Sequence, residues 1–197
     1  MVIREDLLTA FGAEIIKLQK SEMLFKENDV PACYFQILSG RIKLTNFHSE
    51  EREFIHSIHK AGDSVGEIFL FSNHKYPVSA VVMENCTLLQ LQQPQLLKLL
   101  ESDFDLQMDF LNYLAERSYQ SYIFLNSLTS EDAIHKLLTL LDRLKDSTDE
   151  PVHSFKVPYT RKEISFLTGL RIETVIRAFK KMEHEKLIKI VKGRIYY

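Results

Sequence analysis

The sequence predicts an α+β protein in which a β-roll or jelly-roll domain, a long helix and a winged helix-turn-helix follow one another along the chain. Three observations lead to this fold class. Residues 22–92 consist of short segments rich in Val, Ile, Phe and Tyr, separated by Gly, Pro, Asn and Asp. Between residues 104 and 125, apolar or small residues recur in alternating steps of four and three. Residues 160–184 contain two short amphipathic segments joined by a glycine, and a hairpin pattern follows them.

The composition indicates a folded globular chain. Its 197 residues are 45% hydrophobic and 26% charged, which excludes a disordered or fibrous protein. No apolar run of about 18 residues occurs, and residues 1–6 lack the cationic-then-apolar pattern of a secretory leader, so we expect a soluble, cytoplasmic protein. Cys33 and Cys86 form no Cys-x-x-Cys pair, which excludes zinc ribbons, four-cysteine clusters and disulfide frameworks. We expect both to be buried free thiols.

The N-terminal part is expected to begin with one amphipathic helix over residues 5–20, because its apolar residues have helical spacing. These residues are Leu7, Leu8, Phe11, Ile15 and Ile16. Strands are expected at 22–25, 33–39, 41–47, 53–59, 78–83 and 86–92. Many short strands at this spacing are typical of a β-sandwich or jelly-roll barrel.

After Pro94 the period becomes helical, with a short helix near 95–101 and a long helix over about 103–127. One face of the long helix carries a coiled-coil seam: Phe104, Met108, Leu111, Ala115, Ser118, Tyr122 and Leu125. About three heptads make a rod of roughly 36 Å, long enough for the interface of a symmetric homodimer. The alternative is a core helix that packs only within its own chain. Because Leu106, Phe110 and Leu114 form a second apolar face, we expect the helix to do both.

The domain boundary is predicted near Leu128, which gives domains 1–128 and 129–197. Thr129, with an acidic residue three places later, is expected to cap a new helix that contains Ile134, Leu137 and Leu141. Residues 146–151 are expected to form an exposed loop.

The charge is unevenly distributed along the chain. Residues 155–197 contain eleven Lys or Arg and four Glu, a local charge of +7, whereas residues 1–154 carry −9. A basic C-terminal module joined to an acidic body suggests binding of a polyanion, although a solvated lysine-rich face without a partner has the same charge.

The basic module has the signals of a helix-turn-helix. Thr160 and Glu163 fit a capping box, and Gly169 can adopt the positive φ that a sharp turn requires. A second helix from about Ile172 is expected to bury Val175, Phe179 and Met182, and its outward face then carries Glu173, Thr174, Arg177, Lys180 and Lys181. Residues 187–192 and 194–197, separated by a glycine, predict a two-stranded wing.

The outward residues of the second helix suit the major groove of DNA. Arg177 can donate two hydrogen bonds to a guanine, and Glu173 can accept one from a cytosine amino group. The alternative is that these two residues, four apart, pair with each other on the helix surface. The expected DNA-contacting residues, most of them through phosphates, are Arg161, Lys162, Arg171, Ile172, Glu173, Thr174, Arg177, Lys180, Lys192 and Arg194.

These motifs together resemble the Crp/Fnr transcription regulators. The winged helix-turn-helix is matched by the residues at 160–164, 168–169 and 173–177, the early β-roll by those at 34–44, and the start of the phosphate-binding cassette by those at 62–68. The resemblance implies a bacterial, homodimeric regulator that binds double-stranded DNA at an inverted repeat. It also implies RNA polymerase and a small-molecule effector as further partners, and a hinge near 125–130. Ile172 stands where the best-known members have an arginine, which implies a different site preference.

The resemblance also implies a ligand site in the β-roll. Its positions are Gly66, Glu67, Ile68, Ser79 and Ala80, with Ser118 and Tyr119 on the long helix. The arginine that holds the cyclic phosphate in nucleotide-binding members is missing, since Pro77 and Val78 occupy that stretch and His74 and Lys75 are the nearest basic residues. A buried phosphate without a matched cation is strongly destabilised, so we do not expect cyclic AMP to be the effector, which the sequence leaves unidentified.

Other classes of function have weaker support. No nucleophile elbow, phosphate loop or metal-ligand spacing occurs, so we expect no enzyme, no catalytic residue and no metal site. The cysteine cluster that an oxygen-sensing iron–sulfur member needs is absent, so no such cofactor is expected. The remaining alternative is a cyclic-nucleotide-binding or protein-interaction module with no DNA-reading role. Duplex binding that weakens steeply with salt distinguishes a regulator from that module.

Overall fold

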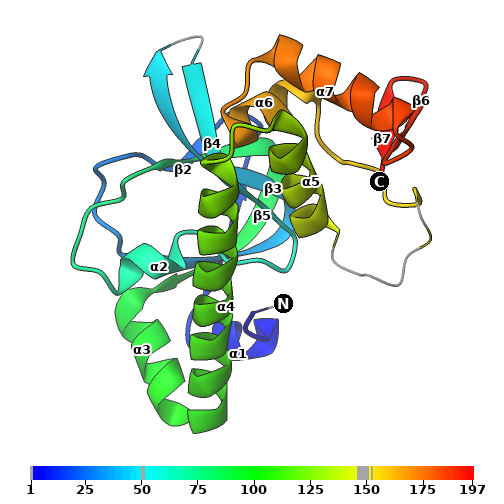
Figure 1. The fold of residues 1–197 in the computed structure, drawn as a ribbon. Helices are drawn as coiled ribbons and strands as arrows, with labels where there is room; N and C mark the ends of the chain where they lie inside the picture. The colour runs from blue at the N-terminus through cyan, green and yellow to red at the C-terminus, as the bar shows by residue number, and fades with distance from the viewer. Residues whose placement is uncertain (1, 50–51, 146–150, 152) are drawn as a thin grey trace. The chain divides into compact units, whose positions relative to one another are not determined.

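A computed structural model describes residues 2–49, 52–145, 151 and 153–197. The chain divides into two compact units, Met1–Glu116 and Arg117–Tyr197. The division falls inside the long helix α4 (Phe104–Leu128), whereas the boundary expected from the sequence coincides with the end of that helix. The structure has the expected α+β architecture of a sheet-rich N-terminal domain, a long helix and a helix-turn-helix (Figure 1).

The sheet of the first unit is antiparallel and has the strand order β1-β5-β3-β4, with β2 also paired to β5. Its strands are β1 (Glu14–Leu18), β2 (Met23–Phe25), β3 (Cys33–Ser49), β4 (Arg52–Lys60) and β5 (Ser79–Gln92). The long strands β3 and β5 form the centre of the sheet, because each pairs with the other and with a further strand. Their side chains build the core that holds the rest of the unit.

The helix expected over residues 5–20 is wrong beyond residue 10. The helix α1 covers Glu5–Ala10, and Gly12 then adopts a φ of +90°, which reverses the chain. Residues 14–18 pair with β5, with Glu14 opposite Gln90 and Leu18 opposite Cys86. A short apolar run fits a helix or a strand equally well, and the open edge of β5 decides for the strand.

Two pairs of expected strands are each one continuous strand in the structure. The strands expected at 78–83 and 86–92 form β5, and those expected at 33–39 and 41–47 form β3. The two halves of β3 join through Gly40, which has a φ of +91°. A Cβ atom at this position would lie 2.4 Å from Cys86 Sγ and 2.6 Å from the Asn85 carbonyl oxygen, so β5 passes too close for any side chain. Both cysteines are buried free thiols, as predicted, and burial raises the pKa of the Cys86 thiol.

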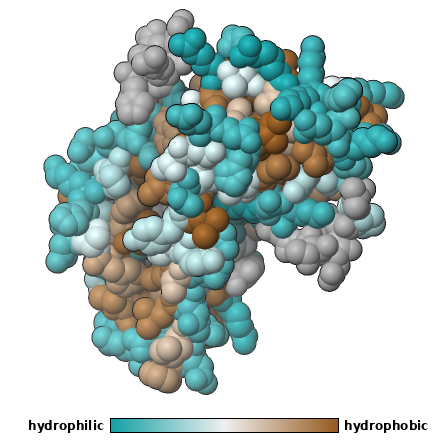
Figure 2. Space-filling view, viewed as in Figure 1, coloured by the Kyte–Doolittle hydropathy of each residue, from teal (hydrophilic) through white to brown (hydrophobic). Residues whose placement is uncertain are grey.

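Two apolar clusters stabilise the first unit. One lies among the strands and includes Phe25, Ile37, Val65, Tyr76 and Leu88. The other lies between the sheet and the helices α1, α3 (Gln93–Ser102) and α4, where its members are Ile3, Leu8, Tyr34, Leu91, Leu96, Leu99 and Phe110. Figure 2 shows hydrophobic side chains over α2 (Glu67–Leu70), α3 and the start of α4. Their exposed members include Ile68, Phe71, Leu97 and Phe104.

In the described residues of the second unit, α4 is followed by three helices and a small hairpin. They are α5 (Ala133–Leu144), α6 (Arg161–Thr168), α7 (Ile172–His184), β6 (Lys189–Val191) and β7 (Arg194–Tyr196). The cap expected at Thr129 is wrong: Asp132 caps α5 by accepting from the Ile134 amide, while Thr129 Oγ1 donates to the Asn126 carbonyl. Most of the loop expected at 146–151 lies outside the described residues. No helix in the described ranges has the length and apolarity needed to cross a bilayer.

Candidate functional site

The first helix of the predicted motif begins at the expected capping box. The Thr160 amide donates to Glu163 Oε2 at 2.6 Å, and the Glu163 amide donates to Thr160 Oγ1 at 3.2 Å. The helix α6 ends at Gly169, whose φ of +69° turns the chain toward α7. These local hydrogen bonds fix where α6 starts, and its residues Ile164 and Leu167 are buried.

The second helix has one buried and one exposed face. Val175, Phe179 and Met182 are fully buried, which confirms the predicted inward positions. Glu173, Arg177 and Lys180 are exposed on the opposite side, and Thr174 is half-buried. In Figure 2 hydrophilic side chains cover α7.

The side chains of Glu173 and Arg177 do not pair with each other among the described residues, so this alternative is not what the structure shows. The ion pair on this helix joins Lys181 to Glu185 at 3.8 Å, one turn beyond the expected base-reading half. An exposed guanidinium without an ion pair keeps all five donors for a ligand. The geometry therefore leaves the expected reading residues of α7 available.

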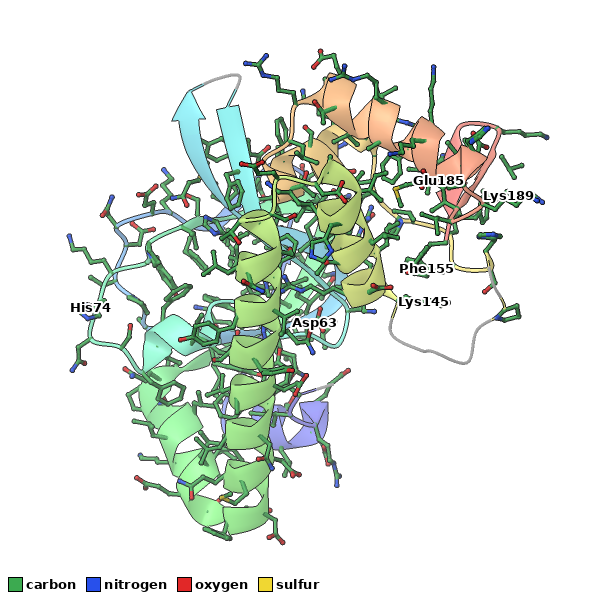
Figure 3. All side chains as sticks on the ribbon, in the orientation of Figure 1. Asp63, His74, Lys145, Phe155, Glu185 and Lys189 are labelled. Atoms are coloured by element: carbon green, nitrogen blue, oxygen red, sulfur yellow. The ribbon has the colours of Figure 1, made fainter. Side chains whose placement is uncertain are left out.

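The other cationic candidates lie around the start of α6 and α7 and on the wing. Arg171 is the N-cap residue of α7, and Ile172, its first residue, is 37% exposed. Lys162 is exposed and lies over the Phe166 ring at 5.7 Å. Lys192 and Arg194 are exposed on the wing, and Lys189, labelled in Figure 3, is exposed at the start of β6.

The wing is hydrogen-bonded to a segment of the chain that the sequence analysis did not identify. Lys192 and Gly193 both have positive φ, 48° and 76°, which makes a two-residue hairpin turn. The strand β7 pairs on its other side with residues 155–157, where the Val157 amide donates to the Ile195 carbonyl at 2.9 Å. Residues 155–157 are too short a segment to predict as a strand from their pattern alone.

Two further side chains contact the wing. Arg161 Nη1 donates to the Gly193 carbonyl at 2.9 Å, although this residue was expected to contact phosphate. Glu183 Oε1 accepts from the Ile190 amide at 3.1 Å, and nothing in the spacing of Glu183 predicted this role. The first contact joins residues 32 positions apart, and the second joins residues seven positions apart that lie on different elements.

The residues expected to form a ligand site lie partly together in the first unit. Gly66 has a φ of +75°, and a Cβ there would lie 2.9 Å from the Phe25 ring and 3.2 Å from the Tyr76 ring. Ala80 pairs with Phe25 across β2 and β5, so Gly66 and Ala80 flank the same aromatic residue. Glu67 is buried at 1% exposure, Ser79 is buried and Ile68 is exposed.

The stretch around Pro77, where the sequence lacks a phosphate-binding arginine, is flanked by the aromatic Tyr76 and the apolar Val78. The Phe25 and Tyr76 rings stack with centroids 3.7 Å apart, and burial raises the pKa of the Tyr76 hydroxyl. Val78 is buried in the core cluster, and Ser79 Oγ accepts from the Glu27 amide at 3.0 Å. Lys75 and His74 are exposed, and His74 lies on the outer loop of this unit (Figure 3).

The expected seam of α4 is exposed along its whole length. Phe104, Leu111, Tyr122 and Leu125 are between 51% and 73% exposed, Met108 is 40% exposed, and Ala115 and Ser118 are also exposed. Phe110 and Phe124, on another face of the same helix, are buried. Ser118 and Tyr119, expected to contact a ligand, are both exposed on the part of α4 that belongs to the second unit.

Comparison with known proteins agrees with this arrangement. A model of the cyclic nucleotide-binding domain matches residues 15–103, and a model of the Crp-like helix-turn-helix domain matches residues 134–197. The chain is 26% identical over 182 residues to the transcriptional activator protein Anr of Pseudomonas aeruginosa, a match that covers 89% of this chain and 74% of that protein.

Solved structures show the same fold. CooA of Carboxydothermus hydrogenoformans superposes with a TM-score of 0.80 at 19% identity, over 98% of this chain and 87% of that chain. The c-di-GMP responsive global regulator CLP of Xanthomonas campestris superposes with a TM-score of 0.74 at 17% identity, over 97% of this chain and 96% of that chain. With both domain models matched in this order and curated relatives that are transcriptional activators, the chain belongs to the Crp/Fnr family of DNA-binding transcription regulators.

Proposed function

We propose that the chain acts in the cytoplasm as a homodimer that binds an inverted-repeat operator through α7 and the wing. The observation that carries the proposal is the outer face of α7, where Glu173 and Arg177 are exposed and make no ion pair with each other. A two-fold dimer presents two such helices, so the half-sites are expected one helical turn, about 34 Å, apart.

The residue types on α7 assign roles within each half-site. Arg177 reads a guanine with two donors, and Glu173 accepts from a cytosine amino group. Ile172 has no donor and contacts a thymine methyl. The remaining cations neutralise phosphates and set the position of the protein on the duplex; they are Arg161, Lys162, Arg171, Lys180, Lys192 and Arg194.

The exposed seam of α4 supports the dimer. Large apolar side chains such as Phe104, Leu111 and Leu125 are exposed at coiled-coil spacing, while Phe110 and Phe124 of the same helix are buried within the chain. A second copy of α4 would cover the exposed seam by knobs-into-holes packing. Residues 125–130, between α4 and α5, would then transmit changes in the sensor domain to α7 if an effector binds two states with different affinity.

The sensor domain is proposed to respond to an effector other than cyclic AMP. Val78 places an apolar side chain in the core where a phosphate needs a cation, and Ser79 Oγ already accepts a backbone hydrogen bond. CLP, which shares this fold, is a c-di-GMP responsive regulator, so the fold is compatible with an effector other than cyclic AMP. We expect calorimetric titration with cyclic AMP and with cyclic GMP to give no saturable heat, and saturation at micromolar concentration would contradict this assignment.

Duplex binding tests the proposal as a whole. An operator is first selected by the chain from a random library, and affinity for it is then measured by fluorescence anisotropy at several salt concentrations. With six to ten phosphate contacts, affinity should fall by about 10³ to 10⁵ between 50 and 200 mM salt. Weak binding that does not vary with salt would favour a module that senses or interacts without reading DNA. Transcription with purified RNA polymerase on the selected operator then tests the polymerase as a partner.

A further inference from the structure

We propose that Arg161 and Glu183 are positioning residues that hold the wing against the base-reading helix and so determine whether the wing cations reach the phosphates. This inference rests on the proposed DNA-binding mode. It assigns Arg161 a role in addition to the phosphate contact expected from the sequence, and it assigns a role to Glu183, an acidic residue in a basic module.

The two contacts hold the turn of the wing and the strand β6. Arg161, the first residue of α6, donates from Nη1 to the Gly193 carbonyl at the tip of the turn, at 2.9 Å. Glu183, in the last turns of α7, accepts from the Ile190 amide in the middle of β6, at 3.1 Å. Hydrogen bonds in which one partner is ionised are the stronger class, so each contact restrains the wing more than a neutral one would.

The strand β6 needs such a restraint more than β7 does. On its outer side β7 is paired with residues 155–157 through backbone hydrogen bonds of 2.9 to 3.1 Å. The strand β6 is three residues long and, within the described part of the chain, pairs with β7 alone, so it is the edge of this small sheet. A two-stranded hairpin has little stability of its own, and its edge amides otherwise bond to water.

The turn between the strands places the cations. Lys192 and Gly193 have φ values of 48° and 76°, and Arg194 follows directly in β7. A Cβ atom on Gly193 would meet nothing within 4 Å, so the turn is held by its conformation and by the Arg161 contact, not by packing. A wing released from Arg161 and Glu183 would move Lys192 and Arg194 together, because the hydrogen bonds between β7 and residues 155–157 involve Ile195 and Tyr197 and leave Arg194 beside the turn.

Substitutions of Glu183 distinguish an effect of its negative charge on operator binding from an effect of its hydrogen bond to the wing. Glu183→Gln and Glu183→Ala remove the same negative charge, but only the glutamine keeps an acceptor for the Ile190 amide. If Glu183 acts only through its charge, both variants bind the selected operator more tightly and equally. If it positions the wing, Glu183→Gln binds at least as tightly as the wild type. In that case Glu183→Ala lowers the slope of log affinity against log salt by up to about 1.8 per protomer, since each lost phosphate contact contributes about 0.9.

Substitutions of Arg161 provide an independent test of the same inference. Arg161→Gln keeps an N–H donor for the Gly193 carbonyl and loses the charge, so the salt slope should fall by about 0.9 per protomer, the value of its own phosphate contact. Arg161→Ala also releases the wing, so its slope should fall by up to about 2.7 per protomer. Equal slopes for the two variants would overturn the role of Arg161 in positioning.

The last test removes the Lys192 charge, both in the wild type and in Glu183→Ala, and measures the salt slope of each protein. Lys192→Asn removes the tip cation while keeping a residue type that tolerates positive φ. In the wild type it should lower the slope by about 0.9 per protomer, and in Glu183→Ala it should have little further effect. Additive losses, or identical behaviour of Glu183→Gln and Glu183→Ala, would overturn the inference.

Circular dichroism of each variant confirms folding. A wild type that binds DNA without salt dependence would instead overturn the proposed function, and this inference with it.

Discussion

Replacing Arg177 by alanine should weaken operator binding at one base pair without changing the stability of the fold. The side chain is exposed and makes no ion pair with Glu173, so its loss leaves no buried group without a partner. Exposed substitutions of this kind change the free energy of unfolding by less than about 0.5 kcal/mol. Alanine also has the highest helix propensity, so α7 itself should remain intact.

The loss in binding follows from the two donors that Arg177 presents. A bidentate contact to guanine contributes about 1–3 kcal/mol of discrimination, which corresponds to a decrease in affinity of about fivefold to 150-fold per half-site. Fluorescence anisotropy on a set of duplexes, each with one base pair of the half-site changed, locates the effect. The wild type should discriminate strongly at one position, and Arg177→Ala should bind all four base pairs there about equally.

Lys180→Ala is the matched control, because Lys180 is also an exposed cation on α7 and is expected to contact phosphate. It should weaken binding to every duplex by a similar factor and lower the salt slope by about 0.9 per protomer. The reasoning about α7 is refuted if Arg177→Ala behaves like Lys180→Ala and loses the same affinity on all sequences.

Three further predictions concern the dimer, the sheet and the wing. Leu111→Asp places a charge in the exposed α4 seam and should shift the chain from dimer to monomer in analytical ultracentrifugation; Asn112→Asp, beside the seam, should leave the dimer intact, since flanking positions of coiled coils carry charges. Gly12→Ala and Gly40→Ala both force alanine to positive φ at about 1–3 kcal/mol, but only the second also meets β5, so urea unfolding should show a distinctly larger loss for Gly40→Ala, and equal losses would contradict the 2.4 Å approach to Cys86. Burial and the hydrogen bond to Asp142 raise the pKa of Tyr197 to about 12, above its ordinary value of 10, so the stabilisation is complete below pH 10 and is lost as the pH rises toward 12; Tyr197→Phe should remove this part of the pH dependence of unfolding, and an unchanged profile would argue against the contact.

Features governed by contacts between neighbours in sequence were predictable. The capping box of Thr160 and Glu163 satisfies its own donors within four residues, so it forms wherever the chain is free to start a helix. The spacing of Val175, Phe179 and Met182 likewise fixed the buried face of α7, and with it the exposure of Arg177. The basic charge of residues 155–197 pointed to a polyanion before any fold was known.

Other features depend on which segments meet in the folded chain. Residues 14–18 have a pattern that suits a helix, yet they form β1 because β5 offers unpaired backbone groups beside them. Asp132, and not the expected Thr129, is the N-cap residue of α5. The Thr129 hydroxyl instead donates a hydrogen bond to the Asn126 carbonyl at the end of α4.

The sequence by itself determined the order of the parts, the two helices of the reading motif and the residues exposed on α7, because short-range periodicity and capping decide all of these. Only the tertiary structure decided how the wing is held, since Arg161 meets Gly193 across 32 positions of sequence and Glu183 reaches an amide on another element. A hydrogen bond between distant residues leaves no periodic trace in the sequence. It exists only when burial of the helices and pairing of the strands bring its two atoms within about 3 Å of each other.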